Sequence, residues 1–206
     1  LVTSNFGSDH VFGSCYGAGL HVIVGGSGKL ATSSNASSWT LRTSSFGSTQ
    51  IRCVAYGGGL FIAGGASGKL ATSSDGISWS QVSGGFGSAQ IESIDFDAAN
   101  GVWMLSDAAG NIGISTDGTT WALIDSGFSG SPVYAVRRCG SQWVEAGGSG
   151  KLSTSPGLEF DGYRLNGRLR FELESVRGGL VSYQKHNHTV LREGYGFNYG
   201  YYYGGQ

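Results

Sequence analysis

Gly64-Gly65-Ala66-Ser67-Gly68-Lys69-Leu70-Ala71-Thr72-Ser73-Ser74-Asp75-Gly76-Ile77-Ser78-Trp79 is the stretch that decides the fold, because the chain repeats it. A close copy occupies residues 25–39, and more diverged copies occupy 110–121 and 147–155. Self-similarity at a spacing of about forty residues is the signature of a repeat architecture. The sequence therefore predicts a repeat domain over 1–162, composed of the units 1–40, 41–80, 81–122 and 123–162.

Each unit predicts four short strands separated by glycine-bearing turns. An alternating strand comes first, at Val11 to Tyr16, Ile51 to Tyr56, Ile91 to Phe96 and Val133 to Arg138. An apolar strand follows, at Leu20 to Val24, Leu60 to Ala63, Val102 to Leu105 and Gln142 to Ala146. The Gly-x-Ser-Gly turn then leads into Lys-Leu-Ala-Thr-Ser, and a last turn leads into a strand that begins at Trp. Four antiparallel strands per unit indicate an all-β propeller of about four four-stranded blades.

The last turn of each unit carries a family resemblance. Thr72 to Trp79 and Ser115 to Trp121 resemble the Asp-box of sialidase-type (BNR) propellers, in the shortened form found in some bacteriophage tail fibres. The structural turn residues are then Asp75, Gly76, Trp79, Asp117, Gly118 and Trp121. An Asp can accept amide protons within its own turn, Gly supplies a positive φ, and Trp anchors the hairpin. The first copy has Asn35-Ala36 instead of Asp-Gly, and the fourth has no Trp.

The fourth unit lacks its last strand, whereas the chain begins with a segment of that type. Residues 1–6 (Leu-Val-Thr-Ser-Asn-Phe) match residues 41–46 (Leu-Arg-Thr-Ser-Ser-Phe). We therefore expect the first residues to complete the fourth blade and close a four-bladed ring. The alternative is that further blades precede this piece of a longer protein.

Residues 163–206 depart from the repeat and predict a small β extension. Leu169, Phe171 and Leu173 alternate with charged residues, as in a half-buried strand, and 194–206 is rich in Tyr and Gly. A segment of this size folds poorly alone. We expect it to serve oligomerisation or attachment, with the Tyr/Gly end as a disordered end, an added strand or an aromatic contact surface.

Composition excludes several classes of protein. Charged residues make up 13% of the chain and the formal net charge is −1, so the basic footprint of nucleic-acid binding is missing. The apolar runs are too short to cross a bilayer, so we expect no membrane insertion. Cys15, Cys53 and Cys139 cannot form a fully paired disulfide framework, and we expect them to be buried as small hydrophobes.

No catalytic arrangement emerges from the sequence, and we expect a protein that is not an enzyme. The Gly-x-Ser-Gly-Lys motif lacks the Ser or Thr that follows Lys in a nucleotide-binding loop, and it lies between strands. Sialidase chemistry would require an arginine cluster and acid groups. Arg137, Arg138, Glu145 and Asp95 are present without evident convergence.

His186 and His188 are candidate metal ligands. On a strand, residues two apart face the same side, and a trimer would bring six imidazole nitrogens to its axis. This His-x-His pattern resembles that of trimeric phage fibre tips and spikes, for which the family implies iron or another transition metal. The alternative, an ordinary exposed polar strand, is the interpretation we favour for a single copy of the motif.

The resemblance and the composition together favour a non-catalytic receptor-binding or adhesion module of a phage tail fibre. Its partners would be a host cell-surface glycan or protein, together with other copies of itself in a homo-oligomer (a trimer) or other fibre proteins. Its location would be the virion tail or the extracellular space. Tyr, Trp, Ser and Gly suit recognition surfaces. The expected ligand-binding residues are Trp103, Trp143, Tyr134, Tyr199, Tyr201 and Tyr202. The alternatives are a structural or assembly component of the tail or fibre and, less favoured, a glycoside hydrolase.

Overall fold

The computed structural model describes residues 2–155, 164–165, 168–169, 176–177 and 180–181. Residues 11–155 form fifteen strands in four antiparallel sheets, which are the blades of a β-propeller. The first blade contains β1 (Val11–Gly17), β2 (Leu20–Gly25), β3 (Leu30–Ser33) and β4 (Thr40–Arg42). The second contains β5 (Ile51–Gly57), β6 (Leu60–Gly65), β7 (Leu70–Ser73) and β8 (Ser80–Val82). The third contains β9 (Ile91–Asp97), β10 (Val102–Asp107), β11 (Asn111–Ser115) and β12 (Ala122–Asp125), and the fourth contains β13 (Val133–Cys139), β14 (Gln142–Gly147) and β15 (Leu152–Ser155). These bounds confirm the predicted strands to within about two residues.

Blades stack through their first strands, which makes these the inner strands of the propeller. β1 packs on β5, β5 on β9 and β9 on β13. The apolar clusters lie between blades: Val22, Val24 and Leu30 of the first blade pack with Phe46 and Ile51 of the second. The larger clusters therefore join neighbouring blades, as the alternating patterns predict, and a smaller cluster of Phe6, Ile23 and Ala31 lies within the first unit.

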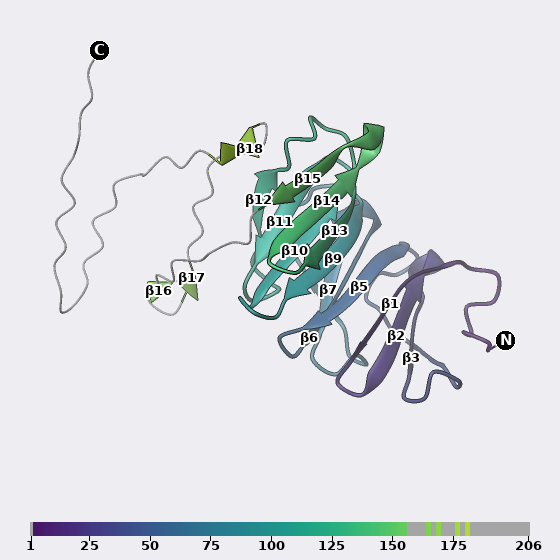
Figure 1. Cartoon of the computed structure of the whole chain (residues 1–206). Coiled ribbons are helices and arrows are strands. Elements are labelled where there is room, and N and C mark those ends of the chain that lie inside the picture. Colours follow the sequence, from purple (N-terminus) through teal and green to yellow (C-terminus); the bar gives the residue numbers. More distant parts are fainter. Residues whose placement is uncertain (1, 156–163, 166–167, 170–175, 178–179, 182–206) are drawn as a thin grey trace, which may run out of the picture.

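The expected ring closure is not formed. Figure 1 shows the blades side by side in an arc, with β1–β3 at one end and β13–β15 at the other. Within the described residues, β15 pairs only with β14, and residues 2–5 belong to no strand. Asn5 donates from Nδ2 to the Trp39 carbonyl oxygen, 2.6 Å away in the first blade, as the equivalent Ser45 hydroxyl donates to the Trp79 carbonyl oxygen in the second. Asn5 thus keeps the contact of its repeat position, although residues 2–5 form no strand.

Three of the Gly-x-Ser-Gly turns contain a single turn of 3-10 helix. These are η1 (Gly26–Gly28), η2 (Ala66–Gly68) and η3 (Gly148–Gly150), and their serines have φ of 54°, 57° and 60°. After each turn a lysine ammonium binds a phenylalanine carbonyl oxygen: Lys29 that of Phe6, Lys69 that of Phe46 and Lys151 that of Phe128. The lysine of the repeated motif thus ties its turn to the segment that precedes the same blade's first strand.

The described parts of the C-terminal segment form two short ladders. β16 (Arg164–Leu165) pairs with β17 (Arg168–Leu169), and β18 (Val176–Arg177) pairs with β19 (Leu180–Val181). The three cysteines are free; Cys15 and Cys53 are partly buried, but Cys139 is exposed, which corrects the expectation for that residue. Among the residues that the structure describes, no helix has the length and apolar character that a membrane span requires.

Candidate functional site

Two of the predicted ligand-binding residues belong to the core. Trp103 and Trp143 are 2% and 0% exposed, so neither indole can contact a ligand in this conformation. Each is the second residue of its blade's second strand, where the second blade has the buried Phe61. The repeat alignment contained this signal, since equivalent positions face the same core. Their expected role is therefore corrected from ligand contact to packing between blades.

Tyr134 is placed on the surface and is 57% exposed. Tyr199, Tyr201 and Tyr202 lie outside the described residues, as do His186 and His188. Within the described residues, no three His, Cys, Asp or Glu side chains are grouped as they would need to be to hold a metal ion. The metal site and the aromatic surface of the C-terminal segment stay predictions.

The predicted structural turns have the expected hydrogen bonds. Asp75 Oδ1 accepts the amide protons of Ile77 and Ser78, each at 2.8 Å, and the Ser73 hydroxyl at 2.9 Å. The Ser78 and Ile77 amides lower the pKa of the Asp75 carboxyl to about 2. Trp79 Nε1 donates to the Gly76 carbonyl oxygen at 3.0 Å, which fixes the indole over the turn. The Asp75 carboxylate and the Trp79 indole N–H are therefore already hydrogen-bonded within the turn.

The turn of the third blade repeats this geometry. Asp117 Oδ1 accepts from Thr119 N at 2.7 Å and from Thr120 N at 2.6 Å, while Gly118 has φ of 72°. Burial raises the pKa of the Asp117 carboxyl, but the two threonine amides outweigh it and leave the pKa at about 2. Trp121 packs against Phe86 with a ring-centroid distance of 6.2 Å.

Each inner strand carries a β-bulge, and the bulge residues form the most distinctive row on the blades. The register shifts between residues 11 and 13, 51 and 53, 91 and 93, and 133 and 135. The residue skipped in each strand is Phe12, Arg52, Glu92 or Tyr134. We call these four the bulge row. Bulges re-aim a side chain out of the ladder and occur next to functional sites, and here the same position carries four different side chains.

Contacts along the bulge row connect three consecutive blades. The Arg52 guanidinium lies 4.6 Å from the centroid of the Phe12 ring. On its other side, Arg52 Nη2 lies 3.5 Å from Glu92 Oε2. Gln50 Nε2 donates to Gln90 Oε1 at 2.7 Å, and Gln90 Nε2 donates to Glu92 Oε1 at 2.7 Å. The row thus combines an aromatic face, a half-exposed cation, an amide ladder and the exposed Tyr134 ring.

Three of the charged residues considered for sialidase chemistry, Asp95, Arg137 and Arg138, do lie close together. They lie at the junction between the third and fourth blades. The Arg138 amide donates to Asp95 Oδ2 at 2.8 Å, and Arg137 Nη1 donates to Ser93 Oγ at 2.6 Å. Arg138 Nε lies 2.8 Å from Asp97 Oδ2 as an ion pair without hydrogen-bond alignment. These contacts join β9 to β13, so the two arginines have structural partners.

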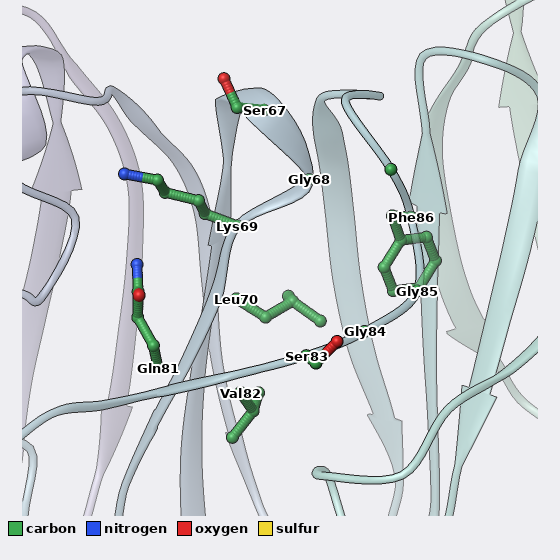
Figure 2. A pocket seen from close by; sticks show the side chains of 11 residues that line it. Ser67, Gly68, Lys69, Leu70, Gln81, Val82, Ser83, Gly84, Gly85 and Phe86 are labelled. Carbon is green, nitrogen blue, oxygen red and sulfur yellow. The ribbon is translucent and has the colours of Figure 1, made fainter.

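A groove of about 320 Å³ lies beside the second blade's outer strand (Figure 2). It is lined by residues 67–70 and 81–87, and Leu70 lies between Lys69 and Phe86. The first and third blades have Ser44 and Ser126 where this blade has Gly84, and each serine hydroxyl donates to a glycine carbonyl at 2.6 Å. Lys69 Nζ already binds Phe46 O and Thr49 Oγ1. The ammonium group that lines the groove is therefore already held by the scaffold, which makes the groove the weaker candidate.

Comparison with known proteins identifies the fold. No protein-family model matches the chain, and no curated protein matches it. Many solved structures are similar to it. The computationally designed Ika4 protein is 15% identical, with a TM-score of 0.59 over 76% of this chain and 96% of that one. The WD40 β-propeller domain of Doa1 is 13% identical, with a TM-score of 0.56 over 73% of this chain and 52% of that one.

Streptogramin B lyase is 14% identical, with a TM-score of 0.55 over 71% of this chain and 54% of that one. The chain thus spans about half the length of the Doa1 and lyase chains. One of these relatives is an enzyme, so the shared fold does not decide between catalysis and binding. At these identities the likenesses establish one property of the chain, which is that it has the β-propeller fold.

Proposed function

We propose that this chain is a non-catalytic receptor-binding module that recognises a host cell-surface glycan or protein. The bulge row carries the proposal, because four equivalent positions on inner strands hold Phe12, Arg52, Glu92 and Tyr134. Flat aromatic faces suit the apolar faces of sugar rings, and the Arg52 guanidinium, whose side chain is 33% exposed, can donate hydrogen bonds to hydroxyl groups.

We propose a bacteriophage tail fibre or similar adhesin as the parent, located in the virion tail or outside the cell. Two observations support this assignment. The turns at Asp75 and Asp117 have the hydrogen bonds that the Asp-box resemblance implies. The blades also form a rigid platform whose loops and bulges differ from copy to copy, as recognition surfaces require.

Several described carboxylates support a role without catalysis. Asp75, Asp117 and Asp107 hold turns through backbone amides. Glu92 faces Arg52, and Glu145 is 7% exposed on β14. A glycosidase needs two carboxyl groups flanking the scissile bond, whereas the three aspartates and Glu92 are held by other contacts and Glu145 is buried. We expect no turnover of fluorogenic glycosides above the buffer rate; measurable turnover would favour the hydrolase alternative.

A binding experiment tests the proposed site. We expect Arg52→Ala and Tyr134→Ala each to weaken binding to a glycan array hit, or to host cells, by about tenfold or more, since each removes a contact of roughly 1.4 kcal/mol. Ile77→Ala, on an exposed turn away from the bulge row, serves as the matched control and should bind like the wild type. Unchanged binding by both bulge-row variants contradicts the site. If the wild type binds no glycan and no host cell, a structural or assembly role is favoured instead.

A further inference from the structure

Equivalent residues are buried in the middle of the arc and exposed at the end formed by the fourth blade. One position at or next to the start of each blade's third strand faces the next blade: Leu30, Ile112 and Leu152 occupy it in the first, third and fourth blades. Leu30 and Ile112 are 0% exposed, whereas Leu152 is 68% exposed. An aliphatic side chain is thus retained at a position where the described chain supplies no neighbour.

The other end of the arc shows the reciprocal pattern. The first residue of each inner strand faces the preceding blade, and it is 0% exposed in Ile51, Ile91 and Val133. The equivalent Val11 is 47% exposed, and Tyr16 on the same strand is 62% exposed. The first blade therefore exposes, at Val11 and Tyr16, part of the surface that the later blades bury, while Ile23 and Ala31 are already covered by Phe6.

Backbone groups at the two ends are complementary as well. In the first junction, Leu30 pairs with Arg42, and the Ser44 hydroxyl donates to the Gly28 carbonyl at 2.6 Å. In the alignment of the repeats, Leu30 and Arg42 correspond to Leu152 and Val2. Ser44 and Gly28 correspond to Ser4 and Gly150. Ser4 Oγ accepts the Phe6 amide at 3.3 Å, as Ser44 Oγ accepts that of Phe46. Ser4 is thus already oriented as in a complete junction.

We propose that a second copy of this chain docks its first blade, with residues 2–6, onto the exposed face of the fourth blade. The contact continues the three blade-to-blade interfaces already present within the chain. It is a head-to-tail contact, in which the two partners use different surfaces. A second copy is the occupant because β1 and β15 lie at opposite ends of the arc (Figure 1), and because each end matches an interface that this sequence already forms. The proposal does not depend on the ligand of the bulge row.

Mixing two end-blocked variants of the full chain tests the contact. Val11→Arg blocks the first blade and Leu152→Arg blocks the fourth, and both side chains are exposed, so the fold should tolerate the changes. We expect the wild type to self-associate with concentration in light scattering coupled to gel filtration. Each variant alone should raise the dissociation constant by about tenfold or more, because the charge would be buried without a partner. An equal mixture should form a one-to-one pair and nothing larger, since one free first blade meets one free fourth blade.

Ile77→Arg is the matched control, with a similar exposed aliphatic residue on an outer turn, and should associate like the wild type. A wild type that stays monomeric at every concentration overturns the proposal, as intramolecular closure or another occupant would then satisfy the ends. Single variants that keep the wild-type mass also overturn it, because assembly would then come from residues 163–206. Far-UV circular dichroism establishes that each variant is folded. If Val11→Arg does not fold, Tyr16→Arg blocks the same face.

Discussion

Asn35 and Ala36 form the same turn as Asp75 and Gly76, although they differ from the preferred residues. Asn35 Oδ1 accepts the Ser37 and Ser38 amide protons at 3.0 and 2.9 Å, because an amide oxygen serves as well as a carboxylate oxygen here. Ala36 has a φ of 57°, in the left-handed region that favours glycine. The first copy has therefore kept the turn's hydrogen bonds at the cost of backbone strain in one residue.

Ala36→Gly should stabilise the protein. Left-handed φ costs an alanine roughly 1–2 kcal/mol, while glycine loses about 0.5–1 kcal/mol of additional chain entropy on folding. We expect the free energy of unfolding to rise by about 0.5–1 kcal/mol, measured as a higher urea midpoint with an unchanged slope. Ala31→Gly, in the buried and extended β3, is the control and should lower the midpoint. A lower urea midpoint for Ala36→Gly would show that the positive φ of Ala36 does not strain the backbone.

Within the fourth blade, β14 carries a carboxyl group where the other blades have aliphatic side chains. Glu145 occupies the position that Ile23, Ala63 and Leu105 have in the other blades. Like them, it lies on the face of its strand that is turned toward the preceding blade. Burial raises the pKa of the Glu145 carboxyl to about 7. The strand pattern, with Trp143 two residues earlier on the same face, therefore determines the environment of this acid.

Replacing Glu145 with Gln should change how stability depends on pH. The pKa of Glu145 is about 7 in the folded chain, against an ordinary value of 4.5 for a glutamate side chain. As the folded-state pKa is raised, the unfolded chain loses this proton first, so wild-type stability falls as the pH rises from about 4.5 to 7. Glu145→Gln removes this loss, and its stability relative to the wild type should grow across that window by up to about 3 kcal/mol. Urea denaturation at several pH values measures it. A difference independent of pH contradicts the assignment.

At the scale of the whole molecule, the larger cores lie between consecutive blades, and a small cluster of Phe6, Ile23 and Ala31 lies within the first unit. Trp143 packs in a cluster with Met104 and Ile114 of the third blade and Val136 of its own. Loss of such a residue weakens the junction that holds two blades together. An exposed bulge residue such as Tyr134 has no comparable contacts to lose.

Trp143→Ala should therefore destabilise the whole chain by about 3–5 kcal/mol, as for other large-to-small changes of buried aromatic residues. Tyr134→Ala should change the free energy of unfolding by no more than about 0.5 kcal/mol. Chemical denaturation followed by circular dichroism compares the two variants. If Trp143→Ala kept wild-type stability and lost only ligand binding, the original expectation of a binding role would be restored.

How far the sequence leads depends on whether a feature is local. The Asp75 and Asp117 turns involve residues within five positions of one another, so their chemistry is visible in the residue order. The bulge row was anticipated only in part, through Tyr134. A bulge arises from a mismatch between two paired strands, and no single strand displays it. Trp103 and Trp143 were wrongly expected to bind a ligand, because tryptophan as a residue type suggests ligand contact. Their repeat position, where the second blade has the buried Phe61, instead indicates the core.

The sequence by itself determined the repeat length, the strands and their turns, because each depends on contacts between residues close in the chain. Only the tertiary structure decided which aromatic rings are buried, how Arg52 lies between Phe12 and Glu92, and that the blades form an open arc. These outcomes depend on the angle and packing between consecutive blades, which sum over the whole molecule. A pattern that describes one blade cannot specify where the fourth blade lies relative to the first.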